Sequence, residues 1–122
     1  MKPDTKELDT VDETCATKIL KWTIFKRGNV ETYEPVGVAI SAFRPTRWIL
    51  DAFKLVDAID ASFKLVRNDD KTFTATFADR TTTHTATKPT ASYAITVAAL
   101  HYVLDAKSGR RGPIGPELDK MR

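Results

Sequence analysis

Residues 72–77 alternate between threonine and apolar side chains. Because successive side chains of a strand point to opposite faces, this period of two predicts a half-buried strand, with aromatic rings on one face and hydroxyls on the other. Residues 81–87 have strand propensity but no apolar face, so they form either a short polar edge strand or an extended loop. At Thr90 the pattern changes into an alanine-rich segment that is too long for a strand.

A second strand, 61–67, precedes the alternating segment and is expected to form a hairpin with it. A three-residue loop, 68–70, places Phe63 opposite Ala75 and keeps the apolar residues of both strands on one face. A two-residue loop would introduce lysine into that face. Because a slip of one residue exchanges the two faces of a strand, we predict the three-residue loop.

Another hairpin is expected between residues 18 and 34. The Gly-Asn pair at 28–29 forms a two-residue turn in which glycine takes the positive φ of a type II′ geometry. The register that follows sets Ile24 against Tyr33, Lys26 against Glu31 as an ion pair, and Arg27 against Val30. Pro35 then marks an edge strand or a bulge, and alternation resumes over 36–40.

An amphipathic helix is predicted from Thr46, its N-cap, to near Asp60. Apolar residues recur at steps of three and four and form one stripe, while charged residues occupy the opposite side. The stripe consists of Ile49, Ala52, Phe53, Val56 and Ile59, widened by Trp48 and Leu55. The charged side consists of Arg47, Asp51, Lys54 and Asp57.

The last helix is predicted to begin after Thr90, its N-cap, and to end before Gly109. Apolar side chains surround almost its whole circumference, which is typical of a helix that is buried on most sides. A strip of alanines, Ala91, Ala94 and Ala98, would allow close approach of a neighbour and is a candidate seam between two copies of the chain. The alternative is that one copy covers its own last helix.

These elements predict an α+β fold with the order β-β-α-β-β-(β)-α. One antiparallel sheet of four to five strands would carry both helices on a single face, as a two-layer sandwich. Residues 15–106 form the single domain. A flexible acidic arm, 1–14, precedes the domain, and a flexible basic tail rich in glycine and proline, 107–122, follows it.

Charge is distributed unevenly along the chain. The arm has five acidic and two basic residues, and residues 18–47 have six basic and two acidic ones, so the two segments could fold onto each other or both be solvated. The formal charge of +3 over 122 residues is mild for a nucleic-acid-binding protein. The candidate partner-binding residues are the basic ones of the first third and the tail: Lys26, Arg27, Arg44, Arg47, Arg110 and Arg111.

Size and composition indicate an ordinary globular domain. A single cysteine excludes an internal disulfide, and no apolar run is long enough to span a bilayer. The polar first residues do not resemble a signal peptide. We therefore expect a cytoplasmic protein that does not associate with membranes.

Few residues could support catalysis or metal binding. His101 lies one helical turn before Asp105, but a histidine satisfied by its neighbour explains this spacing without a catalytic role. His84 is expected to be exposed, and Cys15 to be a small apolar residue at the start of a strand. Two histidines and a distant cysteine lack the spacing of zinc ligands, and no glycine-rich phosphate loop is present. The sequence predicts no enzyme activity, no cofactor and no metal site.

We therefore expect a small, non-enzymatic intracellular protein that acts through a protein–protein surface. A regulator or inhibitor, such as a phage- or plasmid-encoded accessory protein, fits this description. The alternative is a nucleic-acid-binding module that uses the basic first third and the C-terminal tail. Either function is compatible with a homodimer.

Overall fold

The structure is a computed structural model that describes residues 5–34 and 36–107. It confirms the α+β class. The elements, in chain order, are α1 (Thr5–Lys18), β1 (Thr23–Arg27), β2 (Val30–Glu34), β3 (Val38–Ala39), the 3₁₀ turn η1 (Ile40–Ala42), α2 (Ile49–Ala58), β4 (Ser62–Arg67), β5 (Phe73–Ala78), β6 (Thr83–Lys88) and α3 (Ala91–Lys107). The predicted tail beyond Lys107 and the first four residues of the predicted arm lie outside the described residues.

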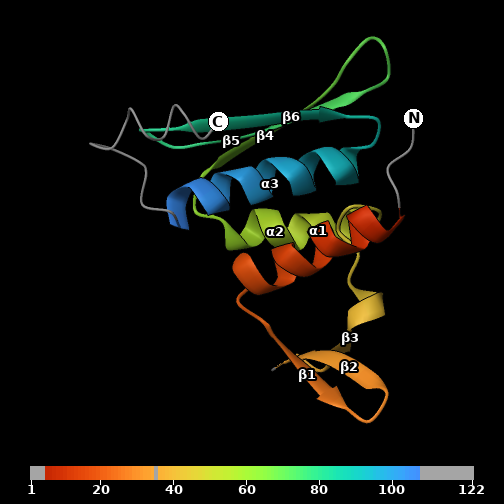
Figure 1. The fold of residues 1–122 in the computed structure, drawn as a ribbon. Coiled ribbons are helices and arrows are strands. Elements are labelled where there is room, and N and C mark those ends of the chain that lie inside the picture. Colours follow the sequence, from red (N-terminus) through yellow and green to blue (C-terminus); the bar gives the residue numbers. More distant parts are fainter. Residues whose placement is uncertain (1–4, 35, 108–122) are drawn as a thin grey trace.

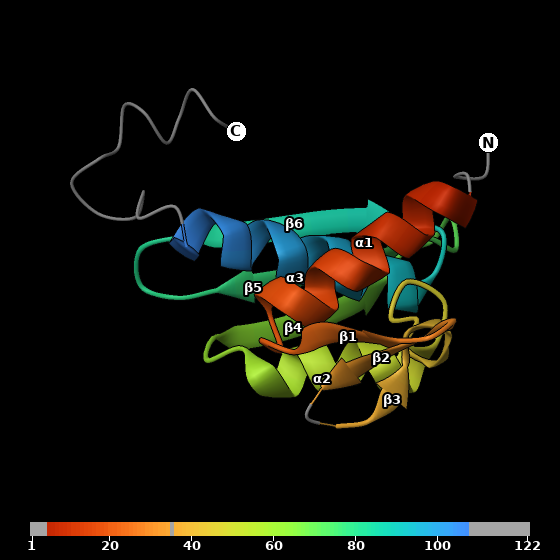
Figure 2. The same ribbon diagram turned by 60° about the horizontal axis from the view of Figure 1, so that its bottom comes forward.

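Helix α3 lies at the centre of the molecule (Figure 1). The sheet β4-β5-β6 covers one side of α3, and α1 and α2 pack against another side. The second sheet, β1-β2-β3, lies beyond α1 at the opposite end of the molecule from β4-β5-β6. Figure 2, in which this end comes forward, shows the small sheet in front of the helices.

The prediction of one sheet with two helices on a single face is wrong. The strands form two separate antiparallel three-stranded sheets, and the described part of the chain contains three α-helices. The reason lies in α3, whose apolar residues surround its circumference and need cover on every side. One sheet and two helices supply this cover, and the first hairpin lies beyond α1 in a sheet of its own.

Helix α1 includes most of the segment that the sequence predicts as a flexible arm, so that prediction is wrong for residues 5–14. The core-facing side of α1 contains Val11 and Cys15, and Ile19, the first residue after the helix, continues this spacing of four. A boundary at residue 14 separates Val11 from the other two and hides this repeat. The strand expected from Lys18 is also wrong at its start, because Lys18 is the last residue of α1.

The register of β1 and β2 is the predicted one, with Ile24 opposite Tyr33 and Lys26 opposite Glu31. Gly28 has a φ of +64°, as the first turn residue of a type II′ geometry requires. The expected ion pair between Lys26 and Glu31 is not among the ion pairs of residues 5–34 and 36–107. Tyr33 is buried, so the register determines which face of the hairpin turns toward the helices.

The hairpin of β4 and β5 has the predicted faces but a longer loop. Phe63 lies opposite Phe77 instead of Ala75, and the loop spans residues 68–72. A shift of two residues does not exchange the faces of a strand, so the hydrophobic pattern alone cannot distinguish the two registers. Asn68 stabilises the longer loop, because its side-chain amide donates to two threonine hydroxyls at 2.9 Å each.

The segment 81–87 is predicted to be either a short polar edge strand or an extended loop. It contributes an edge strand, β6. Threonine hydroxyls of β5 and β6 bond to each other across the strands at 2.8 and 3.1 Å. The predicted cap of the last helix is confirmed, because the backbone N–H of Tyr93 donates to the Thr90 hydroxyl at 3.2 Å.

Helix α2 begins at Ile49, two residues later than a cap at Thr46 implies. Thr46 does not cap the helix, because its backbone N–H and its hydroxyl both donate to Asp12 of α1, at 2.9 and 3.0 Å. Asp51, in the first turn of α2, accepts from the backbone N–H of Arg44 at 2.9 Å. The segment before α2 is therefore bonded to α1 and to α2 at once.

Candidate protein-binding surface

Two of the predicted partner-binding residues, Arg44 and Arg47, are engaged within the chain. Arg44 Nη1 lies 2.8 Å from Asp9 Oδ1, and Arg47 Nη2 lies 2.5 Å from the same oxygen. Arg47 Nη2 also lies 2.7 Å from Asp12 Oδ2. The acidic segment therefore folds onto the basic first third of the chain, which is one of the two alternatives that the charge distribution allows.

The two carboxylates of this network have opposite pKa shifts. Asp9 is half-exposed, and the hydrogen bond from Arg47 lowers its pKa. Asp12 is buried, and its loss of hydration raises its pKa although Arg47 and Thr46 donate to it. Arg47 Nε is buried and has no hydrogen-bond partner within the described residues. Arg44 and Arg47 are both engaged by carboxylates of the same chain, so the candidate surface is sought among the predicted residues outside this network.

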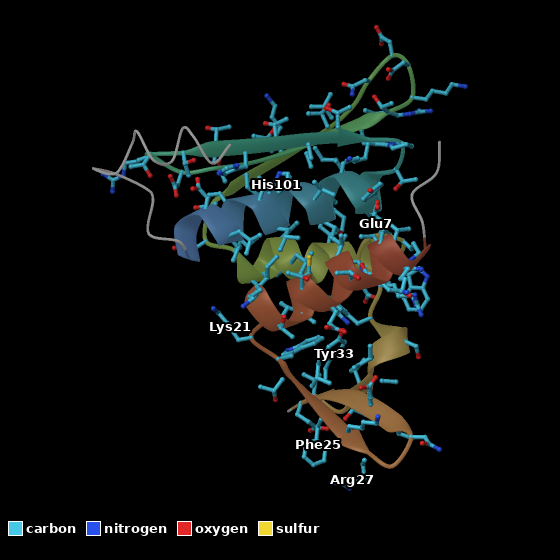
Figure 3. All side chains as sticks on the ribbon, in the orientation of Figure 1. Glu7, Lys21, Phe25, Arg27, Tyr33 and His101 are labelled. Carbon is cyan, nitrogen blue, oxygen red and sulfur yellow. The ribbon has the colours of Figure 1, made fainter. Side chains whose placement is uncertain are left out.

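Lys26 and Arg27 lie on β1, at the end of the molecule farthest from β4-β5-β6 (Figure 3). Both are exposed, and the guanidinium carbon of Arg27 lies 5.2 Å from the ring centre of Phe25. Arg110 and Arg111 lie outside the described residues. The four predicted residues that can be placed therefore form two groups, one on the hairpin and one bonded to α1.

The expected partner of Asp105 is wrong, because Asp105 pairs with His84 and not with His101. His84 Nε2 lies 2.8 Å from Asp105 Oδ2, and both side chains are largely buried. His101 is exposed, and His84 is not. The cause is the edge strand β6, which lies beside α3 and brings His84 to the end of that helix.

The surroundings of His84 do not have the geometry of a catalytic triad. The Thr82 hydroxyl lies 3.4 Å from the same His84 Nε2 that contacts Asp105. In a nucleophile–histidine–acid relay, the two ring nitrogens contact different partners. Here Nε2 faces both the Thr82 hydroxyl and the Asp105 carboxylate. This nitrogen cannot accept a proton from the hydroxyl while it is also the atom through which the carboxylate orients the ring.

Asp79 joins the turn between β5 and β6 to α3. The Tyr102 hydroxyl donates to it at 2.5 Å, and the backbone N–H groups of Thr81 and Thr82 donate to it at 2.8 and 3.0 Å. These bonds lower the pKa of Asp79, and the bond from Tyr102 is the largest cause. A carboxylate with a lowered pKa is a weak proton acceptor, so this arrangement fits a structural bond better than acid–base chemistry.

The remaining predicted residues lie in the core. Cys15 is fully buried on α1, not at the start of a strand, and burial raises the pKa of its thiol. Ala94 and Ala98 are also fully buried, because the sheet and helices of the same chain cover α3, and Ala91 is partly buried. The predicted seam between copies is therefore covered within one copy, which is the alternative that the sequence left open.

No group of three or more histidine, cysteine, aspartate or glutamate residues that could hold a metal ion occurs in residues 5–34 and 36–107. No helix of this part is long and apolar enough to cross a membrane.

The hairpin β1–β2 exposes large apolar side chains. The exposed fraction is 47% for Phe25 and 59% for Val30, and Ile24 is exposed as well. Every residue of β1 is exposed, whereas Tyr33 on β2 is buried. Figure 3 shows Tyr33 between the hairpin and the helices, with Phe25 and Arg27 at the far end.

Three aromatic rings anchor the base of this hairpin. The ring centres of Trp22 and Phe43 are 5.0 Å apart, those of Trp22 and Tyr33 are 5.6 Å apart, and those of Tyr33 and Phe43 are 6.2 Å apart. Tilted and edge-on contacts at these distances stabilise a cluster beyond the burial of its surface. The exposed end of the hairpin can therefore be substituted without opening the core.

A second exposed apolar patch lies at the start of α2. Trp48, Ile49 and Phe53 are exposed, and the exposed fraction of Leu50 reaches 78%. The predicted stripe is therefore wrong at Trp48, Ile49 and Phe53, and Asp51, expected on the charged side, is buried. Leu55 is fully buried as expected. A cluster of large apolar side chains on the surface is a feature of interaction sites, whereas single exposed ones are common.

Residues 13–100 match the family described as Phage ABA sandwich domain. The chain belongs to this family. The 2.0 Å crystal structure of a phage protein from Bacillus cereus ATCC 14579 is similar, with a TM-score of 0.60 and 18% sequence identity over 82% of this chain and 95% of that chain. At this identity the similarity shows the fold alone. No curated protein matches the chain.

Both exposed patches of this phage-family protein have a signal in the sequence. Phe25 falls on the polar face of the predicted strand, where an aromatic residue has no core to enter. Trp48, Ile49 and Leu50 are consecutive in the predicted helix, and three successive side chains of a helix cannot all face the core. For Phe25 and Leu50, an apolar residue at a position that the period assigns to solvent is therefore the informative signal, whereas Trp48 and Ile49 fall on the predicted stripe.

Proposed function

We propose that this chain is a small, non-enzymatic phage accessory protein, a regulator or inhibitor that binds a protein partner inside the cell through the hairpin β1–β2. One observation carries the proposal: the hairpin is anchored at its base by three packed rings, of which Tyr33 and Phe43 are buried, while Ile24, Phe25 and Val30 remain exposed at its other end. An anchored, exposed element can meet a partner without rearrangement of the core.

The composition of the hairpin end suits a protein partner. Burial of a phenylalanine or valine side chain contributes about 1.5–3 kcal/mol, so a partner that covers Phe25 and Val30 gains a substantial part of its binding energy from them. Arg27 lies over the ring of Phe25, and aromatic residues and arginine are enriched among the residues that dominate interface energies. We expect the partner to cover the ring and the guanidinium together.

The polar clusters support the non-enzymatic part of the proposal. Four of the described carboxylates that accept hydrogen bonds, Asp9, Asp12, Asp79 and Asp105, bind groups that connect elements of the fold. His84 is oriented by Asp105 through the nitrogen that a nucleophile would need. These contacts suit structural roles.

Nucleic acid is the alternative partner, with weaker support. Arg44 and Arg47 are bound to carboxylates, which leaves Lys26 and Arg27 as the predicted cations that lie exposed in the described part. Few phosphate contacts give weak binding that is lost as salt rises. We expect fluorescence anisotropy with labelled DNA and RNA to show no binding at physiological salt, and binding that persists there would favour this alternative.

Affinity capture with matched variants tests the proposal. We would express the tagged chain in phage-infected bacterial cells and identify captured proteins by mass spectrometry. Val30→Asp changes an exposed valine on the hairpin, and Val66→Asp makes the same change at an exposed valine on β4, in the other sheet. We expect a protein that wild type and Val66→Asp capture and that Val30→Asp loses, with all three chains showing the same circular dichroism. Equal capture by both variants would contradict the hairpin as the binding site.

A further inference from the structure

We propose that the open edge of β1 pairs with β1 of a second copy of this chain, so that the two small sheets join into one continuous antiparallel sheet. This inference rests on the proposed function, because it names an occupant for the same hairpin. β1 is an edge strand in the order β1-β2-β3, and all its residues are exposed. An exposed edge without proline or a bulge is a template for a further strand.

The turn determines which backbone groups of β1 point outward. A two-residue turn closes with a hydrogen bond between its flanking residues, here Arg27 and Val30. Hydrogen-bonded and non-hydrogen-bonded pairs alternate along antiparallel strands. The backbone groups of Arg27 and Phe25 therefore face β2, and those of Ile24 and Lys26 face the open edge.

Symmetry and charge select one register. In a pair of copies related by a two-fold axis, the outward backbone groups of Ile24 and Lys26 must bond to the same groups of the other copy. The axis can therefore pass at Ile24, Phe25 or Lys26. An axis at Lys26 sets lysine against lysine, which is destabilising. An axis at Ile24 sets Lys26 against Trp22. This register is unfavourable because Trp22 lies outside β1 and its ring packs against Tyr33.

An axis at Phe25 uses every outward group of the strand. Ile24 of each copy exchanges backbone hydrogen bonds with Lys26 of the other, and Arg27 lies opposite Thr23, so like charges are kept apart. The two Phe25 side chains form the central non-hydrogen-bonded pair, in which side chains approach most closely. This pairing brings together two aromatic rings that single chains leave exposed, on the face of the sheet that also carries Arg27 and Val30.

An engineered disulfide tests the register directly. Cα atoms of a non-hydrogen-bonded antiparallel pair are about 4.5 Å apart, within the range that a disulfide bridges. We expect the purified Phe25→Cys variant to form a covalent dimer on mild oxidation, while Cys15 stays unreactive because it is buried. Thr32→Cys is the matched control, since it lies beside Phe25 on β2. Its two copies would be roughly 14 Å apart in the proposed dimer, too far for a disulfide. Equal cross-linking of both variants would overturn the register.

Sedimentation equilibrium over a range of concentrations tests the pairing without cysteines. We expect wild type to dimerise, and Lys26→Pro, which removes an outward N–H but no bond to β2, to raise the dissociation constant about tenfold or more. Monomeric wild type, or an unchanged constant in Lys26→Pro, would overturn the inference. Val30→Asp separates the two proposals, because it lies on β2 away from the edge. If Val30→Asp still dimerises but no longer captures the partner, both proposals are supported. If wild type is monomeric and Val30→Asp loses the partner that wild type captures, the proposed function alone is supported.

Discussion

Arg47 donates to the buried carboxylate of Asp12 over 2.7 Å, and this contact ties α1 to the turn that precedes α2. The same carboxylate accepts from the backbone and the hydroxyl of Thr46. A charge-assisted contact supported by neutral hydrogen bonds can compensate a carboxylate for its loss of water. Asp12 therefore has a large part in holding α1 against the rest of the chain.

We expect Asp12→Ala to lower the free energy of unfolding by about 2 kcal/mol or more, because it leaves Arg47 and the N–H of Thr46 without their acceptor. Urea denaturation followed by circular dichroism measures the loss. Asp9→Ala is the matched control, since Asp9 binds the same arginine from a half-exposed position and should cost less than about 1 kcal/mol. Equal losses would show that burial of Asp12 is not what makes its bonds strong.

Asp79 should make stability depend on pH in the acid range. Its pKa in the folded chain lies below the usual value of 3.8, chiefly because Tyr102 donates to it. A carboxylate with a lowered folded pKa stabilises the fold fully above about pH 4 and loses this contribution as pH falls. We expect the unfolding free energy of Tyr102→Phe and Asp79→Asn to fall less between about pH 5 and pH 2 than that of wild type. Parallel pH profiles for all three chains would contradict this assignment.

The two histidines should respond differently to substitution. His84→Ala removes the ring that faces the buried carboxylate of Asp105, and we expect a loss of about 1–2 kcal/mol in unfolding free energy. His101→Ala changes an exposed residue and should stay within about 0.5 kcal/mol of wild type. Thermal denaturation of the two variants at one pH makes the comparison. A larger loss for His101→Ala would instead support the pair that the helical spacing suggests.

The two leucines of α2 form a further matched pair. Leu55 is fully buried, and we expect Leu55→Ala to cost about 2–5 kcal/mol. Leu50 is 78% exposed, so Leu50→Ala should change stability by less than about 0.5 kcal/mol. Chemical denaturation gives both values. A destabilised Leu50→Ala variant would mean that the patch at the start of α2 is covered in solution.

The hydrophobic pattern predicts the local elements better than their arrangement. The first hairpin has its predicted register, since a two-residue turn and an apolar pair leave no alternative. The loop at 68–72 is longer than predicted. The apolar faces exclude a register shifted by one residue but not one shifted by two, so they do not determine the loop length. Helix α1 is missed, since its stripe is short and is completed by bonds to residues more than thirty positions away.

The candidate site is less predictable than the fold. Basic residues are visible in a sequence, but their availability is not, and Arg44 and Arg47 are occupied by carboxylates of α1. The partner of Asp105 comes from another element and not from the same helix, so spacing along the chain points to the wrong histidine. Phe25 is exposed because it lies on the polar face of its strand. A search for basic residues does not detect this feature.

The position of α3 has a consequence for how the chain acquires its shape. α3 is made after every other described element, yet it is the surface on which the large sheet, α1 and α2 assemble. A nascent chain that lacks α3 has no common core, and its apolar faces stay in water or with chaperones until residues 91–107 emerge from the ribosome. Truncation within α3 should therefore abolish the whole domain at once, because no smaller part can fold ahead of it.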